Sequence, residues 1–139
     1  MNQFIPVYEP YLKGNIKSYV NDCINTGWIS SKGSYVNEFE KSFSKYLDGG
    51  YSTSVSNGTV ALHLALLALG IGSGDEVIVP VFTYIASVNA IKYVGAKPIF
   101  VDADPETWNI DINLIKEKIT SKTKAIMAVH LFGALCDVS

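Results

Sequence analysis

The alternation of short apolar runs with helical segments constrains the fold of this chain most. Four runs rich in β-branched residues predict strands at 52–55, 76–80, 97–101 and 123–129. The segments between them predict helices at 59–69, 85–94 and 112–119. Strands that alternate with helices favour a parallel sheet with right-handed crossovers. We therefore expect an α/β fold in which a mainly parallel sheet carries helices on both faces.

The helix predicted at 59–69 is apolar on nearly all sides. It contains strong helix formers and no charged residue, and Gly70 follows it at a position suited to a helix C-terminus. Apolar side chains surround this helix and do not form a single stripe, which predicts burial on most sides. If part of its cover lies outside these 139 residues, the chain should associate or aggregate.

The turn Ser56-Asn57-Gly58-Thr59 allows two interpretations. Ser56 or Asn57 can cap the helix that follows. The N–H groups of Gly58, Thr59 and Val60 would also point outward at the positive end of the helix dipole, which suits a phosphate. Gly58 lets the backbone approach closely, and the Thr59 hydroxyl adds a donor. The residues alone favour the plain cap, because every buried helix needs one.

An ordinary globular composition excludes several classes of function. The net charge is −2 with 48% hydrophobic residues, so we expect no nucleic-acid partner. No signal peptide or run of 18 apolar residues appears, which favours a cytoplasmic protein without membrane contact. All 11 positively charged residues are lysines, so an anion site must use backbone N–H groups, hydroxyls or lysine. Cys23 and Cys136 match no metal-ligand spacing, and we expect buried free thiols and no metal site.

Residues 1–50 predict an amino-terminal helical arm. Two prolines make 5–10 extended, and apolar periodicity predicts helices at 14–24 and 34–47. Trp28 lies in the loop between these helices. It is either a hydrophobic anchor or part of a ligand mouth, and the anchor is favoured.

Polar and aromatic residues follow the carboxyl ends of the predicted strands, where ligands of open α/β sheets bind. They are Asn57-Gly58-Thr59, Thr83-Tyr84, Asp102 and His130. The set suits a planar phosphorylated ligand with Tyr84 stacked on its ring. The alternatives are a core aromatic role for Tyr84, a turn cap for Asp102 and a core histidine for His63. Neither a strand-linked Gly-x-Gly-x-x-Gly nor a Gly-Lys-Ser/Thr loop occurs, which argues against dinucleotide and P-loop sites.

Five stretches of the sequence resemble one known family. They are SNGTVALH, GDEVIVP, TYIASVNA, PIFVD and VHLFG, in order at 56–63, 74–80, 83–90, 98–102 and 129–133. By these motifs the chain is similar to the DegT/DnrJ/EryC1/StrS-type sugar-nucleotide aminotransferases, which use pyridoxal phosphate (PLP). The resemblance implies the aspartate-aminotransferase-like (type I PLP) fold. Residues 51–139 would then be the amino-terminal, incomplete part of its PLP-binding large domain.

The resemblance also implies roles for individual residues. Gly58, Thr59 and Val60 would hold the PLP phosphate, and Tyr84 would stack on the pyridine ring. Ser31 and Lys32 would lie near the sugar nucleotide. The family's Schiff-base lysine lies beyond the segment that matches 130–133, so no catalytic lysine is assigned here, and the chain alone is expected to be inactive. A remote alternative is that Lys32, Lys92 or Lys97 takes the role of the Schiff-base lysine.

The resemblance is most specific in three further places, the stretches 5–10 and 27–33 and the pair Cys136-Asp137. They are similar to family members that transfer an amino group from glutamate to GDP-4-keto-6-deoxy-mannose in O-antigen synthesis. A homodimer is implied for the full-length form. Two alternatives stay open: an inactive remnant that binds phosphate, PLP or a partner chain, and a PLP-dependent sugar dehydratase of the same family.

Overall fold

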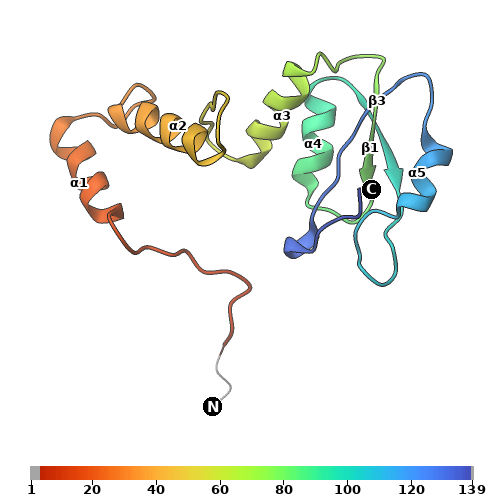
Figure 1. The fold of residues 1–139 in the computed structure, drawn as a ribbon, viewed down its shortest axis with the longest axis horizontal. Coiled ribbons are helices and arrows are strands. Elements are labelled where there is room, and N and C mark those ends of the chain that lie inside the picture. The colour runs from red at the N-terminus through yellow and green to blue at the C-terminus, as the bar shows by residue number, and fades with distance from the viewer. Residues whose placement is uncertain (1–3, 139) are drawn as a thin grey trace. The chain divides into compact units, whose positions relative to one another are not determined.

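The computed structural model of the protein describes residues 4–138 and divides by its internal contacts into two compact units (Figure 1). The first unit ends at Ser54 and contains two helices, α1 (Ile16–Thr26) and α2 (Ser34–Tyr46). The second begins at Val55 and contains α3 (Gly58–Ala68), β1 (Glu76–Pro80), α4 (Ile85–Tyr93), β2 (Lys97–Val101), α5 (Ile112–Lys118), β3 (Thr123–Ile126) and the short 3-10 helix η1 (Leu131–Gly133). The predicted helices are confirmed, with ends displaced by no more than two residues.

The sheet of the second unit is parallel and has the strand order β2-β1-β3. β1 pairs with β2 in regular register from Glu76↔Lys97 to Pro80↔Val101. The pairing of β1 with β3 shifts by one residue after Glu76. All five residues of the central strand β1 are buried, as expected for a parallel strand with both faces covered.

Helices cover both faces of this sheet, which confirms the predicted α/β class. Alternate side chains of a strand point to opposite faces. Val77 and Val79 pack with α4 and with Leu66 of α3 in one apolar cluster. Ile78 and Val101 belong to the second cluster, against which Ile115 of α5 packs. α3 contacts α4, so it forms an outer layer over that helix.

The strand predicted at 52–55 is wrong. The Ser54 N–H and hydroxyl both donate to Glu40 Oε1, at 2.8 and 2.9 Å, so this backbone bonds to a side chain of α2. β3 is also shorter than the predicted 123–129. Its partner β1 ends at Pro80, which has no N–H to donate to a longer ladder.

The predicted burial of α3 on most sides is also wrong. Leu66 is its one buried residue, whereas Val60, Leu64 and Leu67 are 39%, 42% and 52% exposed. α3 packs mainly against α4 and joins the apolar cluster of the sheet only through Leu66, so within residues 4–138 one side of it is covered.

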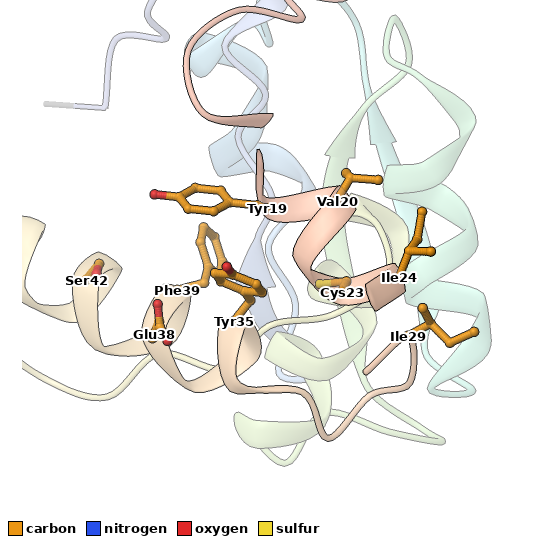
Figure 2. Close-up of a pocket in the computed structure, with 9 residues that line it drawn as sticks. All are labelled: Tyr19, Val20, Cys23, Ile24, Ile29, Tyr35, Glu38, Phe39 and Ser42. Atoms are coloured by element: carbon orange, nitrogen blue, oxygen red, sulfur yellow. The ribbon is translucent and has the colours of Figure 1, made fainter. Parts of the chain in front are cut away.

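The two helices of the first unit enclose an apolar groove (Figure 2). Tyr19 of α1 and Tyr35 of α2 pack together with ring centroids 4.9 Å apart, and the Tyr35 hydroxyl donates to Asp22 at 3.1 Å. The groove has a volume of about 490 Å³ and is lined by Tyr19, Val20, Cys23, Ile24, Ile29, Tyr35, Glu38, Phe39 and Ser42. Neither helix contains a buried residue in the structure.

Candidate functional site

The first turn of α3 combines a helix cap with two N–H groups that face outward. Asn57 Oδ1 accepts a hydrogen bond from the Val60 N–H at 3.1 Å, so Asn57 is the N-cap that the sequence allowed. The N–H groups of Gly58 and Thr59 have no acceptor within residues 4–138, as the geometry of a first turn requires. A Cβ built on Gly58 would meet no atom within 4 Å, so the space in front of this turn is open.

Tyr84 is an exposed aromatic residue at the start of α4. It follows β1 and occupies the N-cap position of the helix. The Thr83 and Ser87 hydroxyls lie 3.0 Å apart and tie the strand-end loop to the first turn of α4. Tyr84 is 81% exposed, so the alternative of a core aromatic residue is wrong.

The first turns of α3 and α4 point to the same end of the second unit, the end at which β1 finishes (Figure 1). This arrangement follows from the chain path, because α3 and α4 lie on either side of β1 in the sequence and pack against each other. The first turn of α3, with Gly58 and Thr59, and the start of α4, with its N-cap Tyr84, therefore lie toward the carboxyl end of β1. The carboxyl edge of the sheet is where ligands bind in open α/β sheets.

Asp102 and His130 have structural roles at this edge. Asp102 Oδ1 accepts from the Ala103 N–H at 2.8 Å, which agrees with the turn-cap interpretation. His130 Nδ1 accepts from the Cys136 N–H at 3.0 Å and fixes the loop after β3. His63 packs edge-on against Tyr93 of α4, with ring centroids 5.6 Å apart.

Asp104 organises the turn that follows β2. Its Oδ1 accepts from the Thr107 N–H at 2.7 Å, from the Thr107 hydroxyl at 2.9 Å and from the Glu106 N–H at 3.0 Å. These bonds favour the ionised carboxylate, so the Thr107 contacts first and the Glu106 N–H after them hold the pKa of Asp104 below its ordinary value. The carboxylate is thus bound by its own loop.

Ser31 and Lys32 lie on the exposed loop between α1 and α2, in the first unit. Trp28 of the same loop is 55% exposed. The structure therefore shows two accessible polar side chains there, and their role stays a prediction. Of the two thiols, Cys136 is buried as expected and Cys23 is only half-buried.

Sequence reasoning missed a buried polar residue and three aromatic residues at the sheet edge. Asn109 is 4% exposed and bonds to the loop after β3. Phe82, Trp108 and Phe132 line a pocket beside it. Phe82 could have been found from its position two residues after β1, at a strand end. Nothing in the local sequence distinguishes Asn109 from other loop asparagines.

A scan against protein-family models matches residues 10–139 to the DegT/DnrJ/EryC1/StrS aminotransferase family. The chain belongs to this family. The match spans most of the chain, both units included, so the resemblance inferred from the motifs is confirmed.

The relatives within the family include proteins named GDP-perosamine synthase. The protein from Escherichia coli O157:H7 is 63% identical over 136 residues, which are 98% of this chain and 37% of that relative. The protein from Vibrio cholerae is 55% identical over 134 residues, 96% of this chain and 36% of that relative. The chain therefore spans about a third of the length of these two curated relatives.

A solved family structure shares the fold. The putative sugar aminotransferase Spr1654 from Streptococcus pneumoniae, in its PLP form, superposes with a TM-score of 0.87 at 39% identity. The alignment covers 96% of this chain and 34% of that protein. The expected type I PLP fold is confirmed by this likeness.

The longest helices between residues 4 and 138 lack the length and apolar character needed to cross a bilayer. In the same part of the chain, no three His, Cys, Asp or Glu side chains are grouped so that they could hold a metal ion.

Proposed function

We propose that this chain is the amino-terminal part of a PLP-dependent aminotransferase that converts GDP-4-keto-6-deoxy-mannose to GDP-perosamine. Glutamate is the proposed amino donor, and O-antigen synthesis the proposed setting. The observation that carries this proposal is the 63% identity to a GDP-perosamine synthase over 98% of the chain. Its cytoplasmic location remains a prediction from the sequence pattern, and its homodimeric state remains a prediction from the family resemblance.

The first turn of α3 fits the phosphate of PLP. A phosphate gains from the Gly58 and Thr59 N–H groups, from the Thr59 hydroxyl and from the positive end of the helix dipole. Hydrogen bonds to a charged group contribute about 1.5–3 kcal/mol each. Because Val60 already donates its N–H to Asn57, it can contribute only by sharing that proton, and its role stays a prediction.

The Tyr84 ring fits the flat face of the cofactor. Its exposure and its place directly after β1 leave it open to a stacked partner. A stacked ring pair contributes about 0.5–1.5 kcal/mol beyond the buried area, so the phosphate contacts should dominate affinity. Bound PLP would supply the electron sink that amino transfer requires. This chain's share is to bind the phosphate and to orient the ring.

The test is PLP binding by the full-length polypeptide, followed by the absorbance of the bound cofactor. Thr59→Ala should weaken PLP binding by roughly ten- to hundredfold, the value of one charge-assisted hydrogen bond. Tyr84→Leu should weaken it by roughly two- to tenfold, the value of one stacked ring. Thr53→Ala, on an exposed threonine of the loop before α3, is the matched control. Unchanged affinity in Thr59→Ala would show that the phosphate lies elsewhere.

A further inference from the structure

A second pocket at the carboxyl edge of the sheet is built from the loops that follow all three strands. Phe82 comes from the loop after β1, Trp108 from the loop after β2 and Phe132 from the loop after β3. The pocket has a volume of about 470 Å³, and Thr107, Leu131 and Ala134 complete its lining. It contains none of the four residues assigned to PLP, although Phe82 is only two residues from Tyr84.

Two of the aromatic residues have positive φ angles. Trp108 has φ 62° and Phe132 has φ 50°, in the left-handed region that bulky residues rarely adopt. Residues held in that region cluster at ligand sites, where the surrounding structure enforces them. The Phe82 and Trp108 ring centroids are 5.5 Å apart at an interplanar angle of 56°, so the two rings form a corner.

The loop that carries Trp108 is closed on itself. The Trp108 N–H donates to the Asp104 carbonyl at 2.8 Å, and the Asp104 N–H donates to the Asn109 carbonyl at 2.8 Å. The Asp111 N–H donates to the Asp102 carbonyl at 2.9 Å and closes the base of the loop. Backbone hydrogen bonds therefore hold the loop that carries Trp108, although the Trp108 side chain is 58% exposed.

Asn109 joins this loop to the loop after β3. Its Nδ2 donates to the Ala134 and Leu135 carbonyls at 3.1 and 3.2 Å, and its Oδ1 accepts from the Leu131 N–H at 3.1 Å. The residue is 4% exposed, so its amide is committed to these three bonds. Replacing it removes the cross-link between the walls of the pocket that carry Trp108 and Phe132.

We propose that this aromatic pocket receives a ring of the acceptor nucleotide sugar, and that Asn109 is the positioning residue that keeps the pocket in shape. The proposal rests on the proposed function for the identity of the substrate. Purine bases stack on aromatic side chains, deoxysugars present an apolar face to them, and aromatic pairs pack edge-to-face as well as offset-stacked. The place of the pocket, beyond the carboxyl ends of parallel strands, is that of a ligand site.

The cofactor and the substrate should respond differently to variants of this pocket. In the full-length polypeptide, Asn109→Ala should raise the KM for the nucleotide sugar by roughly ten- to hundredfold, because the walls of the pocket lose their cross-link. It should leave the affinity for PLP and the absorbance of the bound cofactor unchanged. Asn109→Asp keeps the acceptor for Leu131 and should lie between wild type and alanine. Asn113→Ala, on an exposed asparagine of α5, is the matched control.

Phe82→Leu tests the pocket without touching Asn109. Phe82 is 46% exposed, so this change should spare the fold. It should raise the dissociation constant for the nucleotide sugar, measured by equilibrium dialysis with and without PLP. A dissociation constant within twofold of wild type would overturn the proposal, as would equal loss of PLP and nucleotide sugar in Asn109→Ala. Failure of the wild type to bind PLP would instead contradict the proposed function.

A final comparison identifies which ring occupies the pocket. GDP alone serves as a competitive inhibitor that lacks the sugar. If Phe82→Leu raises the inhibition constant of GDP as much as the KM, the base lies in the pocket. If only the KM rises, the deoxysugar ring lies there. Both results support the pocket as a substrate subsite.

Discussion

The two units of the chain hold their elements together in different ways. The second unit has two apolar clusters, one on each face of the sheet, and a central strand that is entirely buried. The first unit has two amphipathic helices that bury no residue. Its order comes from a ring contact and from polar ties such as Tyr35 to Asp22 and Ser54 to Glu40.

Because of this difference, the two units should respond differently to the loss of apolar side-chain volume. Removing apolar volume should matter in the second unit, because close-packed interiors respond to the loss of single methylene groups. In the first unit the apolar side chains already face solvent, so single truncations have little to remove. Variants of the 139-residue chain should therefore lose most stability where a side chain is fully buried and least where it already faces solvent.

The largest effect is expected at the centre of the sheet. Ile78 is fully buried, and Ile78→Ala should lower the free energy of unfolding by roughly 2–5 kcal/mol. Phe39 lines the groove of the first unit and is 58% exposed, so Phe39→Ala should cost less than about 1 kcal/mol. Urea denaturation measures both. If both variants lost the same unfolding free energy, Phe39 would be packed as closely as a core residue, which would contradict the contrast between the units.

The two N-caps give a matched pair of smaller size. Asn57 accepts a hydrogen bond from the Val60 N–H, whereas Asn15 before α1 makes no side-chain cap bond. Asn57→Ala should therefore cost about 1 kcal/mol, and Asn15→Ala only a few tenths of that. Thermal unfolding followed by circular dichroism gives both values. A larger cost at Asn15 would reverse the contrast between the units.

Glu76 should make the second unit sensitive to acid. Its Oε2 accepts from the Thr120 hydroxyl at 2.7 Å, and this bond, aided by Lys97, holds the pKa of Glu76 below its ordinary value despite burial of the carboxylate. A lowered pKa in the folded state stabilises the fold above the unfolded pKa of about 4.3, and this stability is lost as the pH falls through the folded value. Thr120→Val should reduce this acid-dependent loss of unfolding free energy. Urea denaturation at several values between about pH 5 and about pH 2, a range that spans the titration, measures it.

If the Thr120→Val chain kept the wild-type dependence on pH, the hydroxyl would not be the cause of the lowered pKa. Thr123 is the control position, because its hydroxyl accepts from the Thr120 N–H, whereas the bond to the Glu76 carboxylate comes from the Thr120 hydroxyl. Thr123→Val should therefore leave the titration of Glu76 close to that of the wild type.

The smallest effect is expected at Glu40 in the first unit. Hydrogen bonds from the Ser54 N–H and then from its hydroxyl hold the pKa of Glu40 below its ordinary value. Ser54→Ala removes only the hydroxyl bond, so the pKa of Glu40 should rise part of the way back. Titration of the carboxyl carbon by NMR measures this rise. Ser52→Ala is the control, because the Ser52 hydroxyl accepts from Ser44 and not from Glu40.

The elements that could be predicted from the sequence are those specified by local pattern. β1 and β2 have the predicted bounds because each is a short apolar run enclosed by turn residues. The cap at Asn57 follows from its place directly before a run of strong helix formers. The sequence left a core role for Tyr84 open, and the structure decides that the ring is exposed. The family resemblance added the PLP assignment, which no pattern in the residues could have supplied.

The misses all depend on contacts between distant segments. The run 52–55 has strand propensity, but Ser54 bonds to Glu40, 14 residues earlier. The apolar surface of α3 indicates burial, yet the sequence does not reveal that residues 4–138 cover only the side that faces α4. Asn109 acquires its importance from the loop at 131–135, and its neighbours in the sequence give no sign of that partner.

The division at Ser54 also places one tryptophan in each unit. The sequence contains two tryptophans, Trp28 in the first unit and Trp108 in the second. Each is more than half exposed, so its emission responds to its own surroundings. Trp28→Phe leaves tryptophan emission only from the second unit, and Trp108→Phe leaves tryptophan emission only from the first unit. The chain thus carries a separate optical probe of order for each half, without any added label.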